Sequence, residues 1–229
     1  MDMSSWFGDL GRPVDIYCER TSEALTAEPL NAISNGAFFI AAWAIWRLQQ
    51  RYPNHAFGGA IRALAVIVAI VGAGSFTFHT VATRWAEWVD VVPILVFMIF
   101  YFWVILTAFF RWPWPLKTLA VALLFGATFY LQSDRYEGVL WGGAMYLPTL
   151  IFMLAAGAGI WLRNPSAGQA FYAAAAVFAA SFAARTLDMP LCDSFPLGTH
   201  YLWHVLNAVV LFLLVRTVIV HAPSGRTEE

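Results

Sequence analysis

Long apolar runs alternate with short polar segments along the chain from Leu30 onward. A helix needs roughly 20 mostly apolar residues to cross the hydrocarbon core of a bilayer. The runs are apolar on all sides, so hydropathy rather than an amphipathic stripe identifies them. They predict an all-α, polytopic membrane protein, folded as a bundle of seven transmembrane helices with an intramembrane metal site described below. The predicted spans are Leu30–Leu48, Ile61–Thr80, Trp88–Phe110, Leu116–Leu131, Val139–Leu162, Gln169–Thr186 and Thr199–Val220.

The composition supports this prediction. Hydrophobic residues make up 60% and charged residues 12% of the 229 residues, whereas soluble domains are about half apolar and about a quarter charged. The net charge of -1 gives no basic field, so nucleic acid is not an expected partner. Membrane lipids are the expected surroundings.

The spans leave little chain for a second domain, so the sequence predicts one domain over residues 1–229. Residues 1–29 form a polar extramembrane segment, and residues 222–229 form a short polar tail. The first segment lacks the basic start and apolar core of a cleaved signal.

Lysine and arginine predict the orientation, because they accumulate in cytoplasmic loops. Eight lie on the side of the C-terminus and five on the side of the N-terminus. The N-terminus is therefore expected outside and the C-terminus in the cytoplasm, in what we expect to be a prokaryotic inner membrane. The eight are Arg47, Arg51, Arg62, Arg111, Lys117, Arg163, Arg216 and Arg226, and the five are Arg12, Arg20, Arg84, Arg135 and Arg185.

Polar side chains inside a span are costly and usually mark function. Ser75 and His79 lie four residues apart, on one face of the second span near its outer end. A short hairpin brings Asp90 back to the same depth, and His200 and His204 share one face of the last span. Singly, each residue has an ordinary structural explanation, such as a helix cap or a buried hydrogen bond. Together they predict a zinc site, because three neutral imidazoles leave a fourth position open to water.

Two other uses of these residues fit less well. The last two histidines share one helix face, so they could not bind opposite sides of a haem. A retinal Schiff base needs a lysine within a span, and the single lysine, Lys117, lies at a membrane edge.

The pattern Ser75-x3-His79-x10-Asp90, completed by His200-x3-His204, resembles the alkaline ceramidase branch of the CREST superfamily of membrane hydrolases. The N-terminal Tyr-Cys-Glu-Arg and Ala-Glu-Pro-Leu-Asn elements are also similar to that branch. The resemblance implies seven helices, a zinc ion, and hydrolysis of a ceramide or related N-acyl lipid to a fatty acid and an amine base. In that mechanism Asp90 would transfer protons, and the Ser75 hydroxyl would stabilise the oxyanion.

Two further features belong to the resemblance. Cys18 and Cys192 both fall on the predicted outer side, where an oxidising compartment permits a disulfide, and the ceramidase branch pairs its equivalents. That branch also binds calcium in its N-terminal segment, which here offers Asp15, Glu19 and Glu28. The spacing departs from the family pattern there, and an exposed acidic segment explains these acids equally well.

Two alternative functions remain open at this level. A lipid receptor or sensor of the adiponectin or progestin type would share the zinc constellation. However, resemblance to that branch would imply an N-terminus inside the cell, whereas the arginine distribution here favours an N-terminus outside. A transporter could use the buried acid and histidines as a proton relay, but it would need more charges through the inner half of the bundle.

Overall fold

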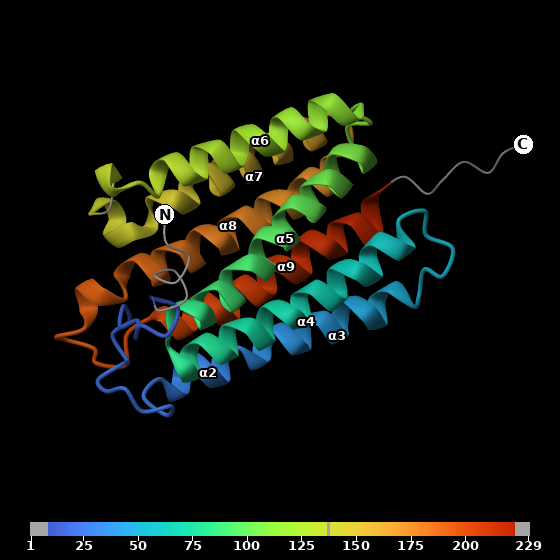
Figure 1. Cartoon of the computed structure of the whole chain (residues 1–229). Helices are drawn as coiled ribbons and strands as arrows, with labels where there is room; N and C mark the ends of the chain where they lie inside the picture. The colour runs from blue at the N-terminus through green and yellow to red at the C-terminus, as the bar shows by residue number, and fades with distance from the viewer. Residues whose placement is uncertain (1–8, 137, 223–229) are drawn as a thin grey trace, which may run out of the picture.

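The computed structural model describes residues 9–136 and 138–222, which fold mainly into helices (Figure 1). Residues 1–8 of the predicted N-terminal segment and 223–229 of the predicted tail lie outside the described part. The helical elements are α2 Pro29–Ser34, α3 Gly36–Gln49, α4 Gly58–Val81, α5 Arg84–Ala108, α6 Trp114–Leu131, η1 Asp134–Tyr136, η2 Val139–Tyr146, α7 Leu147–Trp161, α8 Pro165–Leu187, η3 Met189–Leu191 and α9 His200–His221.

Six helical stretches in the described part are long and apolar enough to cross a membrane. They are α4, α5, α6, η2 joined to α7, α8 and α9, and they match the second to seventh predicted spans to within a few residues. The all-helical class is therefore confirmed, and the six candidate crossings support a multi-pass membrane protein. The first predicted span corresponds to α2 and α3, each of which is shorter than a membrane crossing.

The break between α2 and α3 has a local cause. Both the Ser34 hydroxyl and the Asn35 amide donate hydrogen bonds to the backbone oxygen of Asn31, each at 2.8 Å. The backbone N–H of Asn35 bonds Ala32, three residues back, as in a tighter turn. Polar side chains that compete for helix carbonyls in this way interrupt the regular ladder.

The helices form a closed ring in which each packs on the next and α9 returns to α3. Figure 1 shows successive long helices running in opposite directions, with the described N-terminal segment and the end of α9 at opposite ends. The main core fills the space between α3, α4, α5, α7, α8 and α9. Its fully buried members include Ile45, Leu64, Ile105, Phe171 and Val215.

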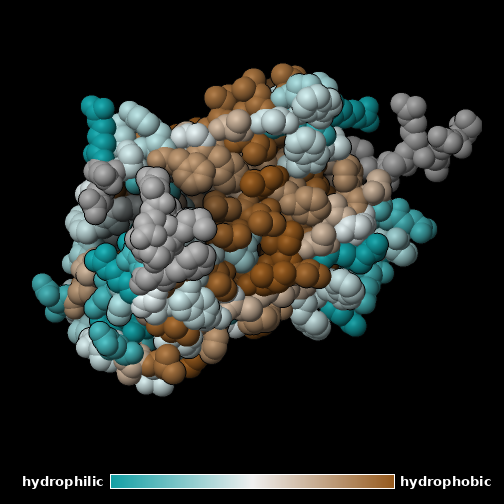
Figure 2. Space-filling view, viewed as in Figure 1, coloured by the Kyte–Doolittle hydropathy of each residue, from teal (hydrophilic) through white to brown (hydrophobic). Residues whose placement is uncertain are grey.

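The outer surface of the ring is apolar where a bilayer would surround it. Figure 2 shows a hydrophobic band across the middle of the molecule and hydrophilic residues towards both ends. Large exposed side chains in the spans include Ile70, Leu123 and Ile151. Exposed apolar surface of this extent is the expected face towards lipid.

The N-terminal segment covers one end of the ring. Pro13 forms an isolated antiparallel bridge with Thr83 in the turn between α4 and α5, and Val14 N–H donates to the oxygen of Ala82 at 2.8 Å. Further along, Cys18 is joined by a disulfide to Cys192, with a Cα–Cα distance of 5.4 Å. The predicted pairing of these cysteines is therefore present, and it ties the segment to the connection between α8 and α9.

Candidate metal centre

Three histidines meet beneath the N-terminal segment, at the covered end of α4 and α9. His79 comes from the last turn of α4, and His200 and His204 come from the first turns of α9. Each offers one ligand atom, and these atoms all lie within 4.8 Å of one another. Their relative exposures are 0%, 2% and 2%, so the group is shielded from solvent. In the described part of the chain, it is the one group of three or more His, Cys, Asp or Glu residues with this geometry.

The His79 ring is oriented by Glu28. Nδ1–H of His79 donates to Oε2 of Glu28 at 2.6 Å, and its Nε2 is buried with no hydrogen-bond partner among the described residues. A carboxylate bound to the far nitrogen of an imidazole fixes the tautomer and raises the basicity of the near nitrogen, as in many zinc sites. The free Nε2 of His79 is thus prepared to bind a metal.

His204 is held in the same way by Ser34. The Ser34 hydroxyl lies 2.8 Å from Nδ1 of His204 and donates its hydrogen bond to the backbone oxygen of Asn31. Nδ1 of His204 must therefore be the donor in this contact, which leaves the lone pair on Nε2.

His200 is fixed by stacking and through its backbone. Its ring stacks on that of Tyr17 at 3.8 Å between centroids, and its backbone N–H donates to Oδ1 of Asp188 at 2.8 Å. Its Nδ1 is buried with no partner among the described residues. Burial raises the pKa of Tyr17 well above its ordinary value, so the ring that covers His200 is a neutral phenol.

These contacts fit a zinc ion. Buried imidazole nitrogens without partners are costly unless something binds them. Here two of the three rings have their outer nitrogen committed to an acceptor, which leaves the inner nitrogen as a neutral donor to a metal. With the His200 imidazole as the third donor and one position open to water, such a set is typical of catalytic zinc sites.

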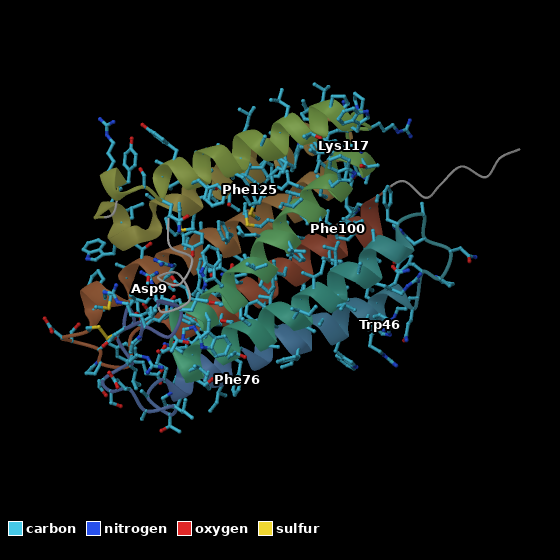
Figure 3. All side chains as sticks on the ribbon, viewed as in Figure 1. Asp9, Trp46, Phe76, Phe100, Lys117 and Phe125 are labelled. Carbon is cyan, nitrogen blue, oxygen red and sulfur yellow. A yellow bond between two sulfur atoms is a disulfide. The ribbon has the colours of Figure 1, made fainter. Side chains whose placement is uncertain are left out.

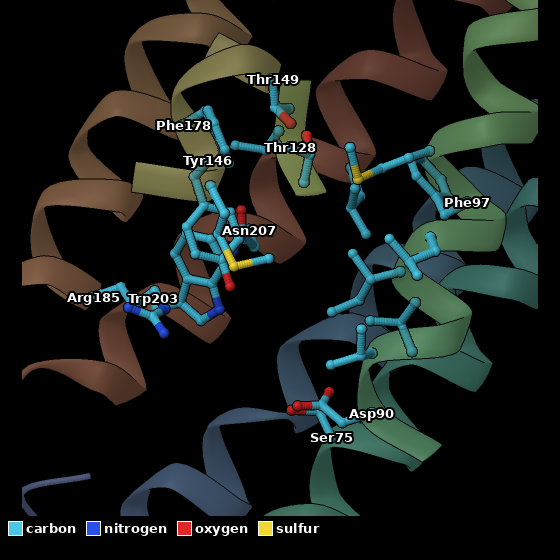
Figure 4. Close-up of a pocket in the computed structure, with 18 of the residues that line it drawn as sticks. Ser75, Asp90, Phe97, Thr128, Tyr146, Thr149, Phe178, Arg185, Trp203 and Asn207 are labelled. Carbon is cyan, nitrogen blue, oxygen red and sulfur yellow. The ribbon is translucent and has the colours of Figure 1, made fainter. Parts of the chain in front are cut away.

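Ser75 and Asp90 lie together across from Arg185 and Trp203 (Figure 4). The contact between α4 and α5 explains their proximity. A Cβ added to Gly74 would lie 2.2 Å from the backbone oxygen of Val89 and 3.4 Å from Cα of Asp90. Only glycine permits this approach, which places Ser75 and Asp90 side by side.

A cavity of about 640 Å³ connects these residues. Ser75, Asp90, His200 and His204 all line it, whereas fully buried His79 does not. From this end the cavity continues into the bundle between apolar walls, which include Phe97, Met98, Phe152, Phe178 and Leu214. Its volume and lining suit a molecule with one polar end and long hydrocarbon chains.

The three acids considered for calcium do not share one environment. Asp15 is exposed, while Glu19 and Glu28 are buried. The Glu19 carboxylate accepts the backbone N–H groups of Leu30 and Asn31 at 2.7 and 2.8 Å.

Glu28 has different donors. It forms a buried ion pair with Arg20 and also accepts hydrogen bonds from Asn31 and His79. Burial alone would raise the pKa of the Glu28 carboxyl, but its hydrogen-bond donors outweigh burial and hold that pKa below the ordinary value. Glu28 therefore acts on the histidine centre as a carboxylate.

The connection before α9 is built around Asp188. Its Oδ1 accepts the backbone N–H groups of Thr199 and His200, and its Oδ2 accepts that of Cys18. Gly198 has a φ of +64°, and a Cβ there would lie 2.2 Å from Oδ1 of Asp188. One carboxylate thus joins the start of α9 to the N-terminal segment.

Several residues of this centre were not assigned roles from the sequence. Glu28 belongs to the family pattern and to the predicted calcium site, and Tyr17 belongs to the family pattern alone. Asp188 was not singled out. The contact of Glu28 with His79 joins positions 51 residues apart, and that of Ser34 with His204 joins positions 170 apart. No local spacing reveals such pairs.

Comparison with known proteins adds one result. The family model described as Ceramidase matches residues 16–228, which is nearly the whole chain. A search among curated proteins gave no match.

Proposed function

Because the chain belongs to the ceramidase family, we propose that it is a zinc-dependent intramembrane hydrolase that cleaves the amide of ceramide or a related N-acyl lipid. The family implies an amide hydrolase and a lipid substrate. The observation that carries zinc dependence is the buried cluster of His79, His200 and His204, with unpartnered nitrogens on two of them.

In this proposal, each residue of the site has its own role. His79, His200 and His204 would hold the ion. When bound, zinc would polarise the amide carbonyl and make water a better nucleophile near neutral pH. Asp90 would take the proton from the attacking water and return it to the leaving nitrogen. The Ser75 hydroxyl would donate a hydrogen bond to the carbonyl oxygen as negative charge develops.

The cavity would hold the two hydrocarbon tails. A lipid that moves into it from the bilayer leaves one apolar medium for another, so tail burial adds little of the usual hydrophobic gain. Selectivity should therefore come from polar contacts at the head of the lipid and from cavity shape.

The membrane arrangement follows from the same proposal. We propose that α2 and α3 together form the first crossing along the chain, which brings the number of crossings to seven. We also propose that residues 1–229 are one domain. The N-terminal segment and the metal centre would then face the periplasm or lumen, and the end of α9 the cytoplasm. A prokaryotic inner membrane stays our prediction.

Calcium binding through Asp15, Glu19 and Glu28 also stays a prediction. The buried guanidinium of Arg20 already supplies positive charge to Glu28. If calcium is nevertheless required, a calcium-selective chelator should abolish hydrolysis while the zinc content stays unchanged. If Arg20 suffices, hydrolysis should continue under the same conditions.

The family match favours a hydrolase over the receptor reading, and no observation specifically favours a receptor or a transporter. A purified protein that holds zinc but hydrolyses no lipid amide would reverse this preference.

Metal analysis combined with a lipid screen tests the proposal. Wild-type protein should contain one zinc per chain and release fatty acid from N-acyl lipids, as measured by elemental analysis and mass spectrometry. His79→Ala should lose most of the zinc and the hydrolysis. His221→Ala, at the opposite end of α9, should keep both. Full zinc retention in His79→Ala would remove this residue from the ligand set.

A further inference from the structure

The cavity contains one strongly basic side chain. Among its lining residues, Arg185 is the single arginine or lysine. It lies in the last turn of α8 and is half-buried. A guanidinium at the end of a membrane-spanning helix is costly unless it reaches water, an anion or another partner.

Among the residues that the structure describes, Arg185 has no carboxylate partner. In the described part of the chain, no acidic group lies within the 4.0 Å of an ion pair with it. Asp188, one turn further along, is occupied by three backbone N–H groups. Glu87, which also lines the cavity, pairs with Arg84 at 3.0 Å. The remaining acid of the cavity, Asp90, lies on the opposite wall (Figure 4).

Aromatic rings hold the guanidinium in place. Its carbon lies 5.1 Å from the centroid of the Tyr146 ring, and Tyr146 packs against Trp203 at 4.8 Å between centroids. All three residues line the cavity. A guanidinium that rests on an aromatic face keeps its N–H edge free for a bidentate contact with a carboxylate or phosphate.

Arg185 is also close to the reaction centre. Asp188, which anchors the backbone of His200, follows Arg185 by three residues, which is about 4.5 Å of helix rise. Figure 4 shows Arg185 beside Trp203 on one wall and Asp90 with Ser75 across from them. A lipid whose amide lay at the histidines could place its polar head against Arg185.

We infer that Arg185 binds an oxyanion on the head of the lipid, so that the preferred substrate class is an anionic N-acyl lipid rather than neutral ceramide. The inference rests on the proposed function for hydrolysis, while binding of the anionic lipid can be measured independently. The oxyanion is either a phosphate on a sphingoid base or the carboxylate of an acylated amino acid.

The test compares three lipids with the same acyl chain: ceramide, ceramide 1-phosphate and an N-acyl amino acid. Equilibrium binding is measured by native mass spectrometry, and hydrolysis by product release. The variants are Arg185→Gln and, as a matched control, Arg135→Gln, which removes an exposed arginine outside the cavity. Thermal unfolding and zinc content are measured for each variant, and Arg185→Lys is added in case Arg185→Gln fails to fold.

Wild-type protein should bind at least one anionic lipid at least 10-fold more tightly than ceramide, and Arg185→Gln should reduce that ratio at least 10-fold. Arg135→Gln should leave the ratio unchanged. If hydrolysis occurs, kcat/KM should show the same pattern, and the lipid with the larger ratio identifies the oxyanion as phosphate or carboxylate.

Other outcomes overturn one proposal or the other. Equal ratios in wild type and Arg185→Gln would show that the guanidinium merely reaches interfacial water, and preference for ceramide would show a neutral substrate. Either would reject the inference even if hydrolysis is observed. Arg185-dependent binding of the anionic lipid without hydrolysis of any lipid would instead reject the proposed function and leave the inference standing.

Discussion

At the scale of single residues, the histidines of the metal centre depend on contacts from distant parts of the chain. Glu28 sets the tautomer of His79, Ser34 sets that of His204, and Tyr17 covers His200. These supporting residues all precede α3, whereas the histidines lie on α4 and α9. The N-terminal segment and α2 are therefore part of the centre rather than accessories to it.

Glu28→Gln should weaken metal binding. The amide keeps the size of the side chain but removes the negative charge that His79 and Arg20 face. Loss of such a partner to a metal-binding histidine typically reduces metal affinity about 10–100-fold. Zinc affinity is measured by competition with a chromogenic chelator, with Glu23→Gln, an exposed acid of the same segment, as the control. Unchanged affinity would show that Glu28 has no influence on the ligand.

Asp90→Asn should separate proton transfer from metal binding. The amide preserves the size of the side chain but cannot shuttle the proton. We expect zinc to be retained and hydrolysis to fall on the order of 10²–10⁴-fold. Loss of zinc in this variant would instead make Asp90 a ligand or an anchor of the ligands.

Ser75→Ala should also retain zinc, and hydrolysis should fall on the order of 10²–10³-fold, the usual effect of removing one oxyanion donor. The two effects are compared as kcat under saturating substrate. A full rate in Ser75→Ala would assign the oxyanion contact to another group.

At the scale of helices, the contact between α4 and α5 determines where Asp90, the proposed proton-transfer residue, lies. A side chain at Gly74 would overlap the backbone of Val89, so the two helices would have to separate. Gly126 in α6 provides a matched comparison, because a Cβ there meets no atom within 4 Å.

Gly74→Ala should therefore reduce hydrolysis while the helical content stays the same. A displacement of about 1 Å at a reacting group can cost on the order of 10²-fold in rate. Gly126→Ala should have no effect on rate and should leave the melting temperature unchanged or slightly higher. Equal rates in the two variants, with zinc retained in both, would show that the α4–α5 contact does not position Asp90.

The sequence predicted the helices more completely than the contacts between them. Apolar runs are long enough to identify six crossings directly. The division of the first span was missed because it depends on Ser34 and Asn35 turning towards one backbone oxygen. The i, i+4 spacing of His200 and His204 correctly places both on one helix face. For Arg185, the sequence predicts only the side of the membrane on which it lies, because no local pattern connects it to the cavity.

At the scale of the whole molecule, the disulfide and the metal centre share one end of the ring. Cys18 and Cys192 join the N-terminal segment to the connection before α9, across 174 residues of sequence. Cys18 lies next to Tyr17, which stacks on His200. The disulfide therefore restrains the N-terminal segment, including Tyr17, in its position over the metal centre.

Reduction of the disulfide should make the N-terminal segment over the metal centre more mobile. Cys18→Ser with Cys192→Ser should lower the melting temperature and increase the rate at which a chelator extracts zinc. Loss of a native disulfide commonly costs about 2–5 kcal/mol of stability in small domains. Both quantities are measured against wild type with and without reductant. An extraction rate that does not change would show that the segment stays seated without the bridge.

The orientation can be checked independently. A green fluorescent protein fused after residue 229 should fluoresce, because the C-terminus is expected in the cytoplasm. An alkaline phosphatase fused at the same place should be inactive. The opposite pair of results would place the metal centre and the disulfide on the reducing side, where such a bridge is disfavoured.

The division of the histidines between α4 and α9 has a consequence for biosynthesis. A nascent chain that has inserted α4 through α8 carries one ligand and the helices around it, but it cannot yet hold the ion. All three histidines can come together only after α9 has left the ribosome and inserted into the membrane. The N-terminal segment is fixed over them only when Cys192 has formed its disulfide with Cys18. If these histidines hold the proposed zinc, metal loading would be a late step of synthesis, and on the proposed orientation the ion would come from the outer compartment.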